Sequence, residues 1–288
     1  MRSLIAASIL LGAALAQKTQ VSNTVYDQLV RYAHFASASY SSNCANPPFG
    51  SSVEKMFEDK KTDTQAILFR DQSAQEYILS FRGTSSVQDF VTDSQQDLIP
   101  CSAAEGISCL DCTCSQGYLG QYVSVQDDIA TTLTSTLAAS PGYKLVVTGH
   151  SMGGALASLA AASLQGKNFT LTAYTYGQPR TGNPAYADYV DTVFTGLNTI
   201  VRATHSNDGV PQIPPQSDGY RHHSTEYWES DNSSSAVGTY QCTGQEPQDC
   251  NQSKKGYGIG NGGVGINLAH LSYFGVSIGN PLKPNAAC

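Results

Sequence analysis

The sequence predicts an α/β fold in which a central, mostly parallel sheet is flanked by helices. Short apolar or β-branched runs alternate with segments of helical periodicity over much of the chain. No break in composition, linker or internal repeat divides residues 17–288, so we expect them to form one domain. A domain of this size buries a core that needs neither a metal nor a partner for its stability.

The periodicity of apolar residues locates the elements in order. Residues 25–40 carry apolar side chains at helical spacing and predict an amphipathic helix that is capped by Asn23 or Thr24. The further elements expected are paired strands at 66–69 and 77–81, a helix at 123–137, a strand at 144–148, a helix at 155–164, a strand at 171–176, a helix at 185–193 and a strand at 199–204. Residues 230–265 are rich in Ser, Gly and Asn and predict loops and edge hairpins.

The first residues have the layout of a secretory signal peptide. A basic Arg2 precedes an apolar run over residues 4–15, and small residues lead to Ala16. We therefore expect residues 1–16 to be removed and the product to be secreted and extracellular. No later apolar run reaches the roughly 20 residues that span a bilayer, so no transmembrane segment is expected. Candidate N-glycosylation sequons begin at Asn168, Asn232 and Asn251.

The charge balance restricts the partners. Lys and Arg number 16 against 23 Asp and Glu, a net charge of −7, which argues against nucleic acid because phosphate binding needs clustered cations. Nothing in the sequence implies a metal or an organic cofactor. We expect a monomer.

Eight cysteines in a chain with an export signal predict four disulfides, whose connectivity spacing alone leaves open. The alternative is a zinc site built from Cys109, Cys112 and Cys114 with His222 or His223. The run from Cys109 to Cys114 lacks the second Cys-x-x-Cys pair that such zinc sites usually have, which disfavours zinc.

The strongest chemical signal is the pentapeptide Gly149-His150-Ser151-Met152-Gly153. An apolar strand precedes it and an Ala/Leu-rich helix follows, which is the context of a nucleophile elbow. The elbow presents Ser151 at a helix N-terminus, where unpaired N–H groups favour a developing oxyanion. The alternative is an ordinary glycine-rich turn between a strand and a helix.

A serine nucleophile needs a base and an acid, which follow it in the order acid, then histidine. Asp208 lies in a turn just after the strand at 199–204, and His270 precedes the short apolar run Leu271-Ser-Tyr-Phe. The residues alone leave other combinations open, with histidines at His205, His222, His223 and acids at Asp188, Asp191, Asp218, Glu226, Glu229, Asp231, Glu246, Asp249.

Across nearly the whole chain after residue 16, the sequence resembles the fungal class 3 lipases and the related feruloyl esterases, which share the α/β-hydrolase fold. The resemblance rests on the elbow and on Ser80-Phe-Arg-Gly-Thr84, on residues 174–183, 205–215 and 222–228, and on Ala269-His270. It implies that Asp208 and His270 complete the triad. It also implies that Thr84, by hydroxyl and N–H, and Met152, by N–H, form the oxyanion hole. Many members have Leu in place of Met152, a change that leaves the N–H unaffected.

The resemblance further implies roles for the remaining motif residues. His150 and His205 are expected to be structural residues, and His222 and His223 to line a loop or edge strand. The implied disulfides are Cys44–Cys288, Cys109–Cys112 and Cys242–Cys250, which leaves Cys101 to pair with Cys114.

The segment after Thr84 bears on the class of ester. Val87, Phe90 and Val91 form an apolar stripe on a short predicted helix, which suits an amphipathic lid over the site, although a surface helix packed on the core would show the same stripe. We therefore expect a lipase that acts on a lipid or ester substrate at a lipid–water interface. The alternative is a feruloyl esterase that acts on hydroxycinnamoyl esters. A serine peptidase and a catalytically inactive binding protein are more remote readings.

Overall fold

The fold is built on a nine-stranded sheet. The computed structural model describes residues 18–84, 97–195, 199–258, 265–280 and 288. The order of the strands in the sheet is β1-β11-β10-β9-β8-β7-β4-β3-β2. Their bounds are β1 Lys18–Gln20, β2 Ser52–Asp59, β3 Thr64–Asp71, β4 Glu76–Phe81, β7 Lys144–His150, β8 Leu171–Tyr176, β9 Thr199–His205, β10 Glu226–Glu229 and β11 Thr239–Cys242.

The central strands β4, β7, β8, β9 and β10 are parallel to one another, and they are neighbours in chain order. Antiparallel strands β3 and β2 extend one edge, and β11 and β1 extend the other. Because parallel strands end at the same edge of a sheet, the residues that follow β4, β7, β8 and β9 come close together. The candidate site lies at this edge.

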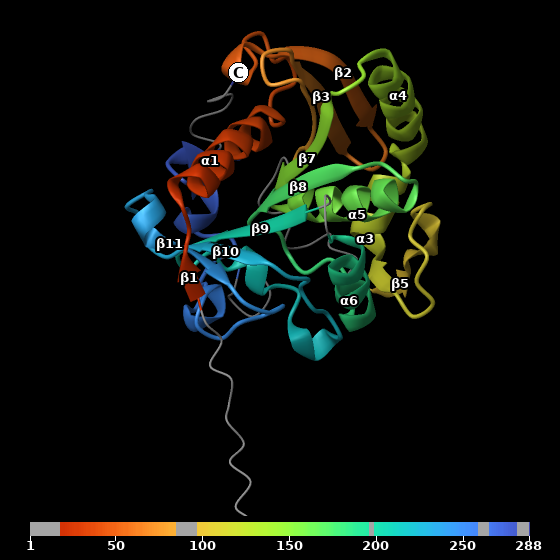
Figure 1. The fold of residues 1–288 in the computed structure, drawn as a ribbon. Helices are drawn as coiled ribbons and strands as arrows, with labels where there is room; N and C mark the ends of the chain where they lie inside the picture. Colours follow the sequence, from red (N-terminus) through yellow and green to blue (C-terminus); the bar gives the residue numbers. More distant parts are fainter. Residues whose placement is uncertain (1–17, 85–96, 196–198, 259–264, 281–287) are drawn as a thin grey trace, which may run out of the picture.

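Helices cover both faces of the sheet (Figure 1). Helix α1 (Asn23–Ala38) packs on one face, and α3 (Gln116–Val123), α4 (Gln126–Ala139), α5 (Met152–Gly166) and α6 (Pro184–Val193) cover the other. The expected α/β-hydrolase architecture is therefore confirmed. No helix within the described ranges is long and apolar enough to cross a bilayer.

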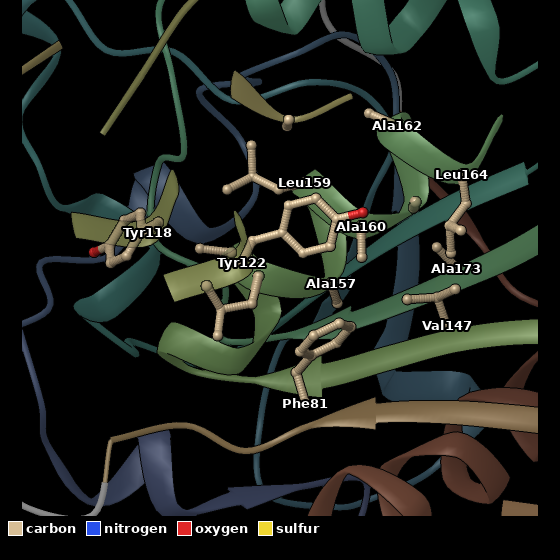
Figure 2. Packing of buried hydrophobic residues seen from close by; sticks show 14 of the residues in the cluster. Phe81, Tyr118, Tyr122, Val147, Ala157, Leu159, Ala160, Ala162, Leu164 and Ala173 are labelled. Carbon is tan, nitrogen blue, oxygen red and sulfur yellow. The ribbon is translucent and has the colours of Figure 1, made fainter. Parts of the chain in front are cut away.

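The alternation of side chains along the strands divides the core into two clusters. Ile78 and Val146 point into the cluster beneath α1, whereas their neighbours Leu79 and Val147 point into the cluster beneath α5. Figure 2 shows the second cluster, in which small side chains of α5 such as Ala157 lie among larger groups. Because both faces are buried, the strands have the nearly continuous apolar composition from which they were predicted.

Most elements lie where the sequence predicts them, and the differences have local causes. The helix expected at 123–137 is α4, which begins at Gln126, because the preceding helix α3 ends at Val123 and the hydroxyl of Ser124 donates to Gln121 O at 2.7 Å. Helix α3 was not predicted. Ser22, not Asn23 or Thr24, caps α1 by accepting from Val25 N. Strand β2 was not predicted, because its half-exposed side chains include charged residues on both faces.

Four disulfides join Cys44 to Cys288, Cys101 to Cys114, Cys109 to Cys112 and Cys242 to Cys250. These are the pairs that the resemblance implies. The zinc alternative is therefore wrong, because the sulfurs that it requires are bonded to one another. The proposed signal peptide, residues 1–16, lies outside the described residues.

Candidate active site

Ser151 occupies a sharp turn between β7 and α5. Its backbone has φ 59° and ψ −131°, a conformation that L-residues rarely adopt. The glycines two positions before and after it permit the turn. A Cβ on Gly149 would lie 2.1 Å from Gly153 O, and one on Gly153 would lie 2.3 Å from Phe81 O. The pentapeptide therefore forms the strained elbow that its sequence predicts.

The surroundings of Ser151 leave its hydroxyl available for reaction. The residue is 2% exposed, and its N–H donates to Tyr176 O at 2.9 Å. Its Oγ is buried and has no hydrogen-bond partner among the described residues. A buried hydroxyl without a partner is unfavourable in a purely structural role, and it points to a site that is built for a substrate.

Asp208 and His270 form a buried pair. His270 Nδ1 lies 2.8 Å from Asp208 Oδ2, and because a carboxylate only accepts, Nδ1 carries the proton. Val210 N donates to Asp208 Oδ1 at 2.9 Å, and the hydroxyl of Tyr273 donates to Oδ2. His270 Nε2 is then the acceptor nitrogen, and it has no partner in the described part of the chain.

Main-chain contacts bring this pair to the elbow. Gly177 follows β8 with φ 55°, and a Cβ there would lie 2.9 Å from His270 Nδ1. Tyr176, its neighbour, accepts the N–H of Ser151. The ring of His150 lies 4.4 Å from the ring of His270, measured between centroids. The structure thus gathers Ser151, Asp208 and His270 at one edge of the sheet.

The expected oxyanion segment lies against the same turn. A Cβ on Gly83 would lie 2.0 Å from Tyr40 Oη and 2.7 Å from His150 O, so the main chain leading to Thr84 passes directly beside the elbow. Met152 is the first residue of α5, and its N–H is one of the first four that lack an acceptor within the helix. The main chain at Gly83 and the N–H of Met152 therefore both lie close to the turn that carries Ser151.

Two supporting residues, Arg180 and Tyr40, were not singled out from the sequence. Arg180 donates to the carbonyls of Gln212 and Pro214 at 2.6 and 2.8 Å and pairs with Glu246 at 2.7 Å, which fixes the loop after Asp208. Arg180 belongs to one of the motifs that carry the resemblance, so a signal existed for it. Tyr40 contacts the elbow only through the tertiary fold, and no pattern in the sequence indicates this contact.

The other motif histidines are buried. His222 and His223 lie in the loop before β10, as expected, and they are 2% and 1% exposed. His222 Nε2 lies 2.7 Å from Pro211 O, and His223 Nδ1 lies 2.6 Å from Ser224 O. Burial lowers the pKa of His222 well below its usual value and that of His223 to about 4, and nearby Arg202 lowers both further. Both histidines are therefore neutral in the folded protein near pH 7.

The structure corrects one of the sequons. Asn168 and Asn232 are exposed, but Asn251 is 2% exposed and its Nδ2 donates to Asp208 O at 3.0 Å. A glycan on that nitrogen is incompatible with this fold, so the candidate at Asn251 is wrong.

Two further expectations concern groups near the site. The lid residues Val87, Phe90 and Val91 lie outside the described residues. Within the described ranges, no three His, Cys, Asp or Glu side chains gather closely enough to hold a metal ion.

Together, the fold and the elbow define a hydrolase of the α/β-hydrolase class. A family model described as lipase (class 3) matches residues 78–218. A secreted mono- and diacylglycerol lipase A of Penicillium cyclopium is 34% identical over 251 residues, which cover 80% of this chain and 79% of that protein. The chain therefore belongs to the class 3 lipase family and is a carboxylic-ester hydrolase.

Solved structures agree with this assignment. A lipase from Rhizopus microsporus var. chinensis has a TM-score of 0.79 at 29% identity, with 92% of each chain covered. A triacylglycerol lipase, described as having a serine protease triad as its catalytic centre, has a TM-score of 0.77 at 29% identity, with 91% of this chain and 99% of that chain covered.

Proposed function

We propose that the protein hydrolyses acylglycerol esters, with Ser151 as the nucleophile, His270 as the base and Asp208 as the residue that orients the base. The observation that carries this proposal is a pair of buried, unpartnered atoms. Ser151 Oγ and His270 Nε2 make no hydrogen bond with any described residue, while His270 Nδ1 is held by Asp208. They do not bond each other either, and such contacts commonly tighten only when substrate binds.

The proposed chemistry follows from this arrangement. Ser151 Oγ attacks the ester carbonyl while its proton passes to His270 Nε2. Thr84 and the N–H of Met152 stabilise the oxyanion, and His270 then returns the proton to the departing alcohol. The acyl-enzyme reacts with water, which His270 activates in the same way. Asp208 keeps the proton of the neutral imidazole on Nδ1 and stabilises the imidazolium that forms.

The relatives and the surface support an acylglycerol substrate at a lipid surface. The Penicillium cyclopium relative is named for mono- and diacylglycerols, and the structural neighbour with the triad is named for triacylglycerols. Leu268 lies two residues before His270 and is 86% exposed, and Tyr257 is 68% exposed. Asn267 links them, because its Nδ2 donates to Tyr257 O at 3.1 Å. Exposed apolar groups beside a reactive histidine favour contact with lipid.

The remaining expectations complete the proposal. We infer that residues 1–16 direct export, that residues 17–288 form one domain, and that the enzyme is an extracellular monomer. Residues 85–96 would include the lid, whose apolar stripe comprises Val87, Phe90 and Val91. The relative's name as a secreted lipase supports the proposed location.

A substrate panel tests the proposal. We expect hydrolysis of emulsified tributyrin and of mono-, di- and triolein, a rise in rate above the solubility limit of tributyrin, and little activity on methyl ferulate. The variant Ser151→Ala should lose hydrolysis of all of them. Preference for methyl ferulate without a rise at the solubility limit would instead support a feruloyl esterase. Normal hydrolysis by Ser151→Ala would contradict the assignment of the nucleophile.

A further inference from the structure

Two buried histidines outside the proposed triad hold consecutive carbonyl groups of the segment that carries His270. His150 Nε2 lies 2.8 Å from His270 O, and His205 Nδ1 lies 2.9 Å from Ala269 O. The two histidines are 1% and 4% exposed. Because a carbonyl oxygen only accepts, the proton must be on Nε2 in His150 and on Nδ1 in His205.

The second nitrogens of the two rings differ in their surroundings. His150 Nδ1 lies 2.8 Å from Tyr40 Oη, and since its Nε2 holds the proton, Nδ1 accepts from the tyrosine hydroxyl. His205 Nε2 has no hydrogen-bond partner among the described residues, and Glu229 Oε2 lies 3.9 Å from it. The ring of His150 is therefore held by hydrogen bonds on both sides, and the ring of His205 by the hydrogen bond of its Nδ1 alone.

The placement of the two histidines in the chain links the three members of the proposed triad. His150 immediately precedes Ser151, and His205 accepts the N–H of Asp208 through its own carbonyl at 2.8 Å. Strand β7 leads to the proposed nucleophile, and strand β9 leads to the proposed acid. Each strand ends in a histidine that binds a main-chain carbonyl of the segment that carries His270.

The held segment has little stability of its own. Residues Leu268–Leu271 form a single 3₁₀ turn, in which Ala269 N and His270 N donate to the side chain and the carbonyl of Asn267. A turn this short relies on tertiary contacts to keep one conformation. The two histidine bonds are contacts of this kind, made directly to the residue that carries the imidazole and to its neighbour.

We propose that His150 and His205 form a two-point clamp, which positions His270 between Asp208 and Ser151. They are positioning residues, and the proposal rests on His270 being the base of the proposed triad. Loss of one clamp bond lets the turn shift, and a displacement of about 1 Å in a catalytic group can cost about 100-fold in rate. We therefore expect His150→Ala and His205→Ala to lower kcat about 10- to 100-fold, with KM for p-nitrophenyl butyrate nearly unchanged.

The first test determines which ring nitrogen of His150 and of His205 carries the proton. Nitrogen-15 NMR of the histidine-labelled protein at pH 7.5 should show His150 as the Nε2–H tautomer and His205 as the Nδ1–H tautomer. The opposite tautomer at either position would overturn that half of the clamp.

The second test measures kcat per active site, with sites counted by titration with an organophosphonate so that unfolded protein is excluded. His150→Gln and His205→Asn place an amide N–H near the original donor and should recover most of the activity that the alanine variants lose. The double alanine variant should lose less than the product of the single losses, because both bonds act on one turn. Tyr122→Phe, which removes a buried hydrogen bond of 2.8 Å to Ser163 away from the site, is the control and should keep normal kcat.

The outcomes separate the clamp from the proposed function. If the wild-type enzyme is not titrated, or Ser151→Ala is titrated as well, the proposed triad fails and the clamp fails with it. If the titration behaves as expected but both alanine variants keep kcat within twofold per site, only the clamp is wrong. Should the alanine variants not fold, Tyr40→Phe removes the partner of His150 Nδ1 without opening a large cavity. Its kcat should fall at least about threefold, and an unchanged kcat would overturn the role of His150.

Discussion

Mild acid should destabilise this protein because three of its histidines are buried in the neutral form. Burial lowers the pKa of His150, His222 and His223 below the usual 6.5, and the guanidinium of Arg202 lowers the pKa of His222 and His223 further. In each ring one nitrogen donates to a carbonyl oxygen: His270 O for His150, Pro211 O for His222 and Ser224 O for His223. A second proton would break the hydrogen bonds that His150 Nδ1 accepts from Tyr40 and His223 Nε2 accepts from Gln178, and it would leave a buried N–H on His222 Nδ1 without a partner.

Proton linkage gives the direction and the size of this change in the free energy of unfolding. The folded-state pKa values are depressed, so the unfolded chain binds more protons below pH 6.5, and the stabilisation that is present above this pH is lost as the pH falls. Between pH 6.5 and 5.5 the unfolded form gains about 1 kcal/mol from each such histidine, or about 3 kcal/mol for the three. This is a large share of the roughly 5–15 kcal/mol by which domains are stable. The Arg31 ion pair lowers the pKa of Asp71 to about 2, so Asp71 acts only at much lower pH.

Urea unfolding followed by tryptophan fluorescence at pH 7.5, 6.5 and 5.5, with the disulfides intact, measures this loss. The variant His223→Asn removes one of the three groups and should reduce the drop between pH 6.5 and 5.5 by about 1 kcal/mol. A drop below about 1 kcal/mol in the unmodified protein would refute the reasoning, because it would mean that fewer than two of the histidines remain neutral on folding.

Three further outcomes are expected. Leu268→Asn should lower the rate on emulsified tributyrin several-fold while leaving the rate on soluble p-nitrophenyl acetate unchanged, and an equal loss on both would contradict contact with lipid. Tyr273→Phe removes a donor from the buried carboxylate of Asp208 and should cost about 1.5–3 kcal/mol of stability in urea unfolding. Peptide mass spectrometry of protein secreted from a eukaryotic host should find a glycan at the exposed Asn168 and none at the buried Asn251, where any glycan would contradict the fold.

Elements whose formation depends on local pattern were predictable from the sequence. The β8 segment was predicted with its observed bounds, since its Thr and Tyr residues favour a strand and nearly all of its side chains are buried. The elbow was predictable because its pentapeptide stands between an apolar strand and an Ala/Leu-rich helix, although the contact that requires Gly153, with Phe81 O, is a long-range one. The two expected partners of Ser151 were reached through the resemblance, because spacing alone left several acids and histidines open.

What sequence reasoning missed depends on long-range contacts. Tyr40 and His150 are far apart in the chain, and only the packing of α1 on the sheet brings the hydroxyl to the imidazole. The burial of Asn251 likewise results from tertiary structure, since the sequon itself carries no information about exposure. The same holds for the clamp, because nothing in the sequence places His205 beside Ala269.

The most direct test of the central claim is to trap the intermediate at the elbow. Treatment with a chromogenic alkyl phosphonate, followed by peptide mass spectrometry, should give one adduct per molecule, located on Ser151. The rate of its formation should fall at least about 1,000-fold in His270→Ala, because the serine then lacks its base. An adduct on another residue, or labelling at an undiminished rate in His270→Ala, would contradict the account.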